Sequence, residues 1–405
     1  MIHKKTSMAK HSQPLQRHLD TLYVHGGITR DANNGASSTP IYQVSTFHQE
    51  DPLHIGTWDY ARSGNPTRNA LEKAVAELEG GAIGLAFSSG MAAISSTLLL
   101  FEPGDHLVVC EDVYGGTYRA LTNLFKRWGL LVTFADATDL QSFRNAITPK
   151  TKALFVETPS NPLLKVTDLR GIVALAKEFG LLAITDNTFL SPALQRPITL
   201  GFDIVLHSAT KFLAGHSDVI AGIAVTREEE LGNRLRSIQN SFGAILGPQD
   251  SWLVQRGIKT LGVRMERQQQ TALALARWLS TNSQVLKVNY PGLVEHQGHA
   301  IHASQSLGGG AVISFELANE SAAVTLMQHV KVPLVGVSLG GVETILSYPT
   351  TMSHASMPAQ ERIARGITPG LLRLSVGLEN QHDLQDDFSQ AFQYIQHITS
   401  IGDHT

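Results

Sequence analysis

One lysine stands at a position that suits catalysis better than exposure to solvent. Lys211 follows the apolar segment 203–206, which is typical of a short buried strand, and hydroxyl residues flank it in the run 207–212. Partial desolvation past the end of a strand would lower the lysine pKa and free the amine to react. The hydroxyls of Ser208 and Thr210 are suited to holding an anion such as a phosphate. A solvated loop lysine with chance hydroxyl neighbours is the alternative.

Two further groups of residues follow short apolar runs. Ligands of open α/β sheets bind outside the carboxyl ends of the strands, so these residues are expected beside the lysine. Ser89, Gly90 and Met91 open a predicted helix, whose free N–H groups and dipole favour a phosphate. Asp186 ends a strand, where its carboxylate would keep a pyridinium nitrogen protonated. A capped turn and a local cap or ion pair are the ordinary explanations. Together with Lys211, these residues predict a Schiff-base lysine that holds pyridoxal phosphate (PLP).

Three more polar residues are candidates for contacts with a planar ring or a substrate. Tyr114 precedes the turn 115–117, from which it can stack on a ring and act as an acid or base, but a packed helix start would also use it. Asn161 can donate to a ring hydroxyl or a carboxylate, and a turn asparagine before proline is the alternative. Arg373, within the apolar strand 371–376, needs an anion, either a substrate α-carboxylate or a structural partner.

The segment 21–62 shows little periodicity but holds several apolar and aromatic side chains, which predicts an extended arm lying on another surface. Tyr60 and Arg62, near its end, are suited to binding a phosphate. Such an arm is not expected to fold back onto its own sheet, so these residues would serve the site of a neighbouring subunit. By periodicity alone they are surface residues.

The elements that must position these residues become regular from residue 64. Short apolar strands alternate with longer helical patterns, which predicts an α/β fold with a mostly parallel sheet covered on both faces. The predicted strands are 84–87, 106–110, 131–134, 153–157, 182–185 and 203–206, and the helices are 66–79, 91–101, 118–128, 139–147 and 169–179.

The pattern changes in the last third of the chain. A long helical pattern at 249–281 is interrupted at Gly257 and Gly262. Beyond it, predicted strands 285–290, 310–317, 334–338 and 371–376 mix with helices 322–329 and 384–398. The expected organisation is an arm at 1–62, a large PLP-binding domain at 63–262 and a smaller α+β domain at 263–405.

Composition limits the class of protein. The 405 residues exceed one ordinary core, and 42% hydrophobic with 17% charged residues is normal for a compact soluble protein. The net charge of −3 gives no electrostatic reason to expect nucleic acid or an anionic membrane as a partner. Cys110 is the only cysteine, which excludes an intrachain disulfide framework and a cysteine metal cluster and fits a cytoplasmic location.

Several sequence signals are missing. The chain has no GxGxxG and no GxxxxGK[ST] motif, so dinucleotide-binding and ATP-binding classes are disfavoured. The 17 histidines show no metal-ligand spacing, so no metal is expected. No stretch reaches the roughly 18 to 20 apolar residues that span a bilayer. Residues 1–20 are polar, lack the apolar core of a signal peptide and are expected to fray, and Met8 is an alternative start.

The run 203–218, DIVLHSATKFLAGHSD, resembles the signature of the Cys/Met-metabolism family of fold-type-I PLP enzymes. The similarity extends from about residue 20 to about residue 398. The family includes cystathionine γ-synthases, cystathionine β- and γ-lyases, methionine γ-lyases and O-acetylhomoserine sulfhydrylases. The resemblance implies a transferase-like large PLP domain, a small C-terminal domain, an N-terminal arm and a homotetramer of two catalytic dimers.

The resemblance also implies a role for each matching residue. Lys211 is similar to the Schiff-base lysine that shuttles the α-proton, Tyr114 to the ring-stacking tyrosine and Asp186 to the pyridinium partner. The implied phosphate ligands are Ser89, Gly90, Met91, Ser208 and Thr210, with Tyr60 and Arg62 lent by the partner subunit. The implied grip on the substrate α-carboxylate is Asn161, Ser338 and Arg373.

Family members differ at a few positions. Methionine γ-lyases carry a cysteine where this chain has Gly116, and Gram-negative β-lyases carry a tryptophan where it has Leu339. The segments 87–95 and 346–349 look most like Gram-positive cystathionine β-lyases, whereas Glu343 slightly favours γ-lyases and also occurs in γ-synthases. The resemblance therefore predicts cleavage of cystathionine by β-elimination to homocysteine, pyruvate and ammonia.

Three alternatives remain open. The first is γ-elimination to cysteine, 2-oxobutyrate and ammonia, in which Lys211 would also move a β-proton. The second is γ-replacement on an activated homoserine, and the third, from another class, is a PLP-binding regulatory protein without turnover. The expected substrate is a small amino acid in every enzymatic case.

Overall fold

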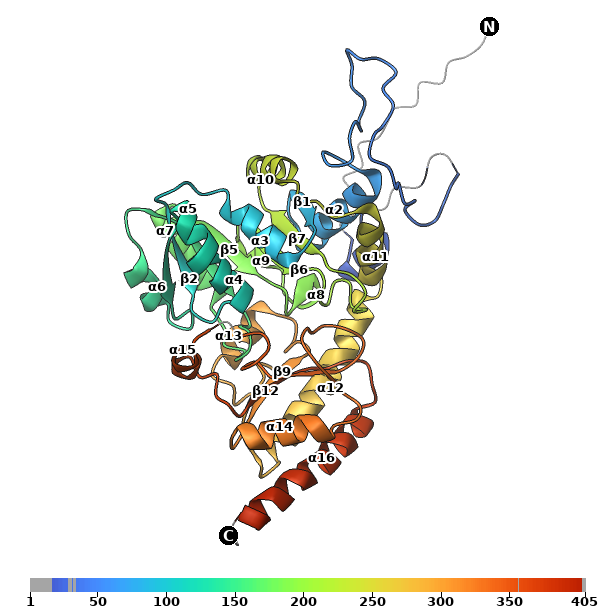
Figure 1. Cartoon of the computed structure of the whole chain (residues 1–405). Helices are drawn as coiled ribbons and strands as arrows, with labels where there is room; N and C mark the ends of the chain where they lie inside the picture. The colour runs from blue at the N-terminus through green and yellow to red at the C-terminus, as the bar shows by residue number, and fades with distance from the viewer. Residues whose placement is uncertain (1–16, 28–30, 32–33, 356, 403–405) are drawn as a thin grey trace.

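The structure is a computed structural model that describes residues 17–27, 31, 34–355 and 357–402, with side chains described to residue 395. The expectations for residues 1–16, including Met8 as a start, fall outside the described residues. Two sheets stand one above the other in Figure 1, each with its own hydrophobic cluster. None of the described helices is long and apolar enough to cross a membrane.

The larger sheet has the strand order β1-β7-β6-β5-β4-β2-β3. Its strands are β1 (Ile83–Phe87), β2 (His106–Cys110), β3 (Leu131–Ala135), β4 (Thr151–Glu157), β5 (Leu182–Asp186), β6 (Ile204–Ser208) and β7 (Gly222–Thr226). From β6 to β3 every neighbouring pair is parallel, whereas β7 runs antiparallel to both β6 and β1. The predicted mostly parallel α/β sheet is confirmed. Strand β7 was not among the predicted strands.

Helices cover both faces of this sheet. A Cβ on Gly84 of β1 would meet α2 (Pro66–Glu79), whereas the adjacent Ile83 packs against Gly232 of α10 (Glu229–Phe242). Neighbouring residues of a strand point to opposite faces, so α2 and α10 lie on opposite sides. Helix α9 (Pro197–Leu200) contacts both α2 and α7 (Leu169–Phe179), and α3 (Gly90–Leu98) contacts α10.

Local signals fix several helix ends. Asn65 caps α2 by accepting hydrogen bonds from the N–H groups of Thr67 and Arg68, and Gly80 ends the helix with φ 78°. Helix α7 has the predicted bounds, and α6 (Leu140–Ala146) follows its cap Asp139. The predicted helix at 118–128 begins earlier: α4 (Gly115–Arg119), the π-helix η1 (Ala120–Phe125) and α5 (Lys126–Trp128) follow one another directly.

Gly262 does not interrupt a helix, contrary to the expectation. Helix α11 (Pro248–Ile258) ends near Gly257, but α12 (Leu261–Ser280) passes through Gly262. A Cβ on Gly262 would lie 2.7 Å from the Tyr23 ring of α1 (Leu19–His25), so the glycine makes room for a neighbouring helix.

The smaller sheet has the order β10-β11-β12-β9-β8. It contains β8 (Val285–Asn289), β9 (Val312–Leu317), β10 (Leu334–Val335), β11 (Ile345–Ser347) and β12 (Leu371–Ser375). Three helices pack with this sheet. Helices α12 and α14 (Glu320–His329) contact its strands, and α16 (Gln381–Gly402) contacts both of these helices. The remaining described helices are α8 (Ser191–Leu194), α13 (His299–Gln305) and α15 (Ala359–Ala364). Strand β10 is shorter than predicted and β11 is an addition, but the α+β character is confirmed.

The segment from residue 34 to residue 62 extends away from the rest of the molecule in Figure 1. A single β-bridge, between Thr46 and Tyr60, joins its two sides. Leu53 and Ile55 are 86% and 59% exposed. These exposed apolar side chains agree with an arm that a second surface must cover. The contact of the arm with a neighbouring subunit stays a prediction.

Candidate functional site

Lys211 lies just past the end of β6 and is largely shielded from water. Its Nζ donates a hydrogen bond of 2.7 Å to the Ser338 hydroxyl. Burial, and then the positive charge of Arg373, lowers the Lys211 pKa to about 8. Ser338 comes from the loop after β10 and has φ 97°, an unusual conformation for a residue with a side chain. The expected desolvated amine is present, and the solvated-loop alternative is not supported.

Arg373 on β12 is fully buried among hydrogen-bond acceptors. Its guanidinium donates to Asn161 Oδ1 at 2.9 Å, to the Ser338 carbonyl at 2.7 Å and to Ser347 Oγ at 3.1 Å. Burial lowers its pKa to about 10. Nε has no partner, and among the described residues no ion pair joins Arg373 to a carboxylate, although the charge of Glu157 partly opposes the fall in its pKa. A structural salt bridge is therefore not what holds this arginine, and its charge is available to an anion that enters the site.

The N-terminus of α3 meets the end of β6. Ser89 caps the helix by accepting from the Ala92 N–H at 3.0 Å, and helix geometry leaves the N–H groups of Gly90 and Met91 without intrahelical acceptors. A Cβ on Gly90 would lie 2.9 Å from the Cβ of Ser208, so only glycine allows this approach. The structure thus brings together four of the residues expected around a phosphate, namely Ser89, Gly90, Met91 and Ser208.

Thr210 lies in the same turn, but its hydroxyl is already bonded. It donates to the Ala221 carbonyl at 3.2 Å and accepts from the Ala221 N–H at 3.0 Å. These bonds fix the chain between β6 and β7, so the geometry fits a positioning hydroxyl better than a free phosphate ligand.

Asp186 ends β5 and is almost completely buried. Its Oδ1 accepts from the N–H and the hydroxyl of Thr188 at 2.9 and 2.5 Å. Burial raises the Asp186 pKa, and the Thr188 bonds and the charge of His207 oppose that rise. The local cap that was the alternative explanation is therefore present, and Thr188 leaves the second carboxylate oxygen for another donor. The short D-x-T spacing could have identified Thr188 in the sequence.

Tyr114 is held by a residue that the sequence did not single out. Its backbone N–H donates at 2.8 Å to Glu157, a buried carboxyl opposite Asp186 on the neighbouring strand. Burial and the nearby Asp186 raise the Glu157 pKa well above its usual value. A Cβ on Gly116 would lie 2.4 Å from the Tyr114 ring and 2.9 Å from Met91 Sδ, so the ring packs closely on one side. The tyrosine remains 38% exposed on the other.

His354 is a second residue without a sequence signal. It is 2% exposed, hydrogen-bonds Ser353 through Nδ1 at 2.9 Å and lies close to Asn161 and Arg373. Burial, followed by the charges of Arg373 and Arg365, lowers its pKa to about 4, so it is a neutral wall of the Arg373 site.

Tyr60 and Arg62 do not join these residues within the described chain. The Arg62 guanidinium lies 5.6 Å from the centre of the Tyr60 ring and donates to the Asn240 carbonyl of α10 at 3.0 Å. Tyr60 is 45% exposed. Both side chains therefore stand on the arm, away from the strand ends of their own sheet.

The grouped residues fit PLP by their chemistry. The α3 N-terminus and Ser208 provide N–H and hydroxyl donors for a phosphate, Asp186 an acceptor for a pyridinium, and Lys211 an amine for an aldehyde. The unpartnered Nε of Arg373 marks a place for a further anion. The arrangement can hold a phosphorylated aromatic aldehyde next to an amino acid.

Known proteins agree with this chemistry. The model of the family described as "Cys/Met metabolism PLP-dependent enzyme" matches residues 20–393. The chain is 55% identical to cystathionine β-lyase MetC of Bacillus subtilis over 96% of this chain and 98% of that one, and 50% identical to the cystathionine γ-lyase of the same organism over 93% and 99%. It also matches the solved cystathionine γ-lyase of Lactobacillus plantarum, complexed with L-serine, with a TM-score of 0.92 and 45% identity, covering 94% and 100%. The chain belongs to the family of Cys/Met-metabolism PLP-dependent enzymes.

Proposed function

We propose that the protein is a carbon–sulfur lyase that cleaves cystathionine by β-elimination, releasing homocysteine, pyruvate and ammonia. The observation that carries the proposal is the pairing of Lys211, an amine with a lowered pKa, with the buried Arg373 through Ser338. An amine for proton transfer thus stands next to a cation for an α-carboxylate. The relative with 55% identity bears the name cystathionine β-lyase, which favours this substrate.

The proposed PLP ligands divide by chemistry. Asp186 would face the pyridinium nitrogen, and the Tyr114 ring would lie against the cofactor. The phosphate would be held at the α3 N-terminus by Ser89, Gly90 and Met91 and at the end of β6 by Ser208, which Thr210 keeps in position, with Tyr60 and Arg62 contributed by a neighbouring subunit. Bound PLP supplies an electron sink for the carbanion that forms when a substrate loses its α-proton.

The substrate would be oriented by its carboxylate. Arg373 is proposed to bind that group, with Asn161 and Ser338 keeping the guanidinium in place. A fixed carboxylate leaves the amino group and the α-proton on the side of Lys211. Orientation of this kind contributes by holding the reacting atoms at attack distance.

Lys211 is proposed to move the proton. A pKa near 8 leaves a useful fraction of the amine neutral at neutral pH, so Nζ can take the α-proton. The departing sulfur needs a proton as well, and Lys211 or the hydroxyl of Tyr114 is proposed to donate it. Burial around Lys211 limits access of competing water to the amine.

The second candidate is γ-elimination, which gives cysteine, 2-oxobutyrate and ammonia. It is favoured by the γ-lyase relative with 50% identity and by Glu343, which accepts a hydrogen bond from Ser217 near the Lys211 turn. The test is incubation of the purified enzyme with cystathionine, followed by separate assays of pyruvate and 2-oxobutyrate. Pyruvate in excess supports β-elimination, whereas 2-oxobutyrate in excess overturns it in favour of the γ-lyase.

The assignment of Lys211 has its own test. Lys211→Ala is expected to lose the visible absorbance of the lysine-bound cofactor and all measurable turnover, because the amine is both attachment point and base. The matched control is Lys152→Ala, which removes an exposed lysine from β4 and is expected to change neither. Retained turnover in the first variant would contradict the assignment.

Assembly and location are also proposals. The exposed arm, with Leu53, Ile55 and Tyr60 on its surface, supports a homotetramer of two dimers in which each arm covers a neighbouring subunit. The single cysteine and the absence of a spanning helix among the described residues are compatible with a cytoplasmic enzyme.

A further inference from the structure

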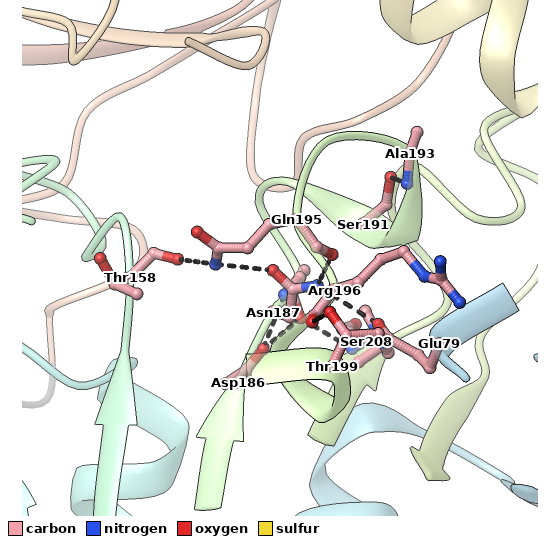
Figure 2. Close-up of polar contacts among 12 residues, drawn as sticks. Glu79, Thr158, Asp186, Asn187, Ser191, Ala193, Gln195, Arg196, Thr199 and Ser208 are labelled. Atoms are coloured by element: carbon pink, nitrogen blue, oxygen red, sulfur yellow. Dashed lines mark hydrogen bonds and ion pairs between the residues drawn. The ribbon is translucent and has the colours of Figure 1, made fainter. Parts of the chain in front are cut away.

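A buried polar network lies below the strand ends, on the side of the sheet that α2 covers. Glu79, the last residue of α2, and His207 of β6 have side chains 0% and 1% exposed, and 2.7 Å separates Glu79 Oε1 from His207 Nε2. Asn187 Nδ2 also donates to Glu79 Oε1, at 3.3 Å. Figure 2 shows this carboxylate among residues from several loops. The mechanism proposed above uses none of these three side chains.

The network joins the loops that carry the proposed site residues. Asn187 stands between Asp186 and Thr188, and its amide donates to the Gln195 carbonyl at 2.8 Å. Gln195 returns a bond to Asn187 at 3.1 Å and donates to the Thr158 carbonyl at 3.3 Å (Figure 2). The ends of β4, β5 and β6 are therefore connected through side chains of α2 and the α8–α9 linker.

His207 and Asp186 lie on opposite faces of the sheet. In the strand register Asp186 pairs with Leu206, so the next residue, His207, points to the other face. His207 instead aligns with Ile223 of β7, on the α2 side. His207 thus lies near the Asp186 end of β5 on the opposite face of the sheet. The residues there are buried, so water screens charges poorly.

Stability alone is a weak reason for this pair. Burying two charges costs about as much as their attraction returns, and an apolar pair of the same volume is often as stable. Glu79 Oε2 and His207 Nδ1 also have no partner in the described chain, although both are buried. A polar pair with unsatisfied atoms directly behind a candidate cofactor site points to a role in that site.

We propose that Glu79 and His207 form a positioning pair for Asp186. The Glu79 carboxylate orients the imidazole through Nε2, and the imidazole held in this way supports the ionised Asp186 carboxylate across the sheet. The inference rests on the proposed role of Asp186 as the partner of a pyridinium nitrogen. His207 and Glu79 touch neither cofactor nor substrate and act only through Asp186.

Other charged groups surround the two residues. Asp186 faces Glu157 on β4, and its charge also raises the pKa of Cys110 on β2. Near the pair, Arg196 packs against the turn at Gly80, with its Nη2 2.9 Å from where a Cβ on that glycine would be. Asp186 opposes ionisation of Glu157, whereas His207 favours ionisation of Asp186. The state of Asp186 therefore depends on both sides of the sheet.

The test measures PLP affinity as a function of pH in the full-length Lys211→Ala protein, where binding is non-covalent. The affinity for PLP is expected to fall at acid pH as Asp186 takes up a proton, and this falling part of the pH profile is the acid limb. Because His207→Gln removes the imidazole but keeps a donor for Glu79, it should move this acid limb to higher pH by about one unit. Glu79→Gln should move it in the same direction, and the double variant should add little to either single change.

Three comparisons make the result decisive. His106→Gln removes another buried histidine, at the opposite end of the sheet on β2, and should leave the acid limb in place. If Asp186→Asn abolishes the limb while both pair variants leave it unmoved, the positioning pair is disproved. If Asp186→Asn leaves the limb unchanged, the proposed role of Asp186 fails instead. Glu79→Gln keeps the shape of the network and provides the measurement should His207→Gln not fold.

Discussion

At the scale of single residues, two cations and one buried carboxyl set the electrostatics of the candidate site. Lys211 and Arg373 stand out because a cation just past an apolar strand, or inside one, has few structural uses. Glu157 looks like an ordinary strand end in the sequence, and only the pairing of β4 with β5 sets it beside Asp186. Its bond to the Tyr114 N–H joins residues 43 positions apart, so no local pattern contains it.

The lowered pKa of Lys211 predicts how the apoprotein captures PLP. Only the neutral amine attacks an aldehyde, so the rate of capture should rise about tenfold per pH unit up to a midpoint near 8 and then level off. An ordinary lysine would place that midpoint above pH 10. The measurement is the stopped-flow absorbance change on mixing apoprotein with PLP between about pH 6 and pH 11.

Arg373 provides the comparison for this profile. Its charge contributes to the lowered Lys211 pKa, so Arg373→Met should move the midpoint upward. Ser338→Ala removes a neutral partner and should change the midpoint less. A midpoint near that of a free lysine in the unchanged protein would contradict the desolvated site.

At the scale of helices and strands, local sequence signals predict the bounds of an element when the residues that end it belong to it or adjoin it. The bounds of β2 and α7 are as predicted because the apolar run of the strand and the capping residues of the helix are local to each element. Strand β7 was not predicted, since its pairing depends on distant parts of the chain. It runs antiparallel to β6 and also to β1, which lies more than a hundred residues earlier in the sequence. Gly262 looks like a helix break until the Tyr23 ring of α1 is seen against it.

The cap of α2 allows a quantitative prediction at this scale. Asn65 accepts hydrogen bonds from two helix N–H groups and is 1% exposed, so water cannot replace it. Asn65→Ala should lower the free energy of unfolding by about 1 to 2 kcal/mol. Asn65→Asp keeps the acceptor oxygens but loses the amide donor to the Tyr42 carbonyl, and should cost less than the alanine variant. Denaturant unfolding of the apoprotein measures both, and equal losses would show that the cap is not the cause.

At the scale of the whole molecule, the described chain gathers a site that still lacks two of its expected residues. Asp186 and Ser208 end neighbouring strands of the large sheet, and Ser338 links Lys211, just past β6, to Arg373 of the small sheet. Tyr60 and Arg62 remain on an exposed arm, held to Asn240 of α10. The sequence could indicate the arm from its lack of periodicity, but a contact between two chains has no signature within one chain.

Mixed assemblies test whether the arm serves a neighbouring site. A Lys211→Ala subunit and an Arg62→Ala subunit are each expected to be poorly active alone. When they are unfolded and refolded together, a mixed dimer would have one site with both residues intact, because the Lys211-containing subunit receives the intact arm of the other. About half of the dimers are mixed and half of their sites are intact, so roughly a quarter of normal activity should return. If each arm instead served its own subunit, every site would keep one defect and mixing would restore no activity.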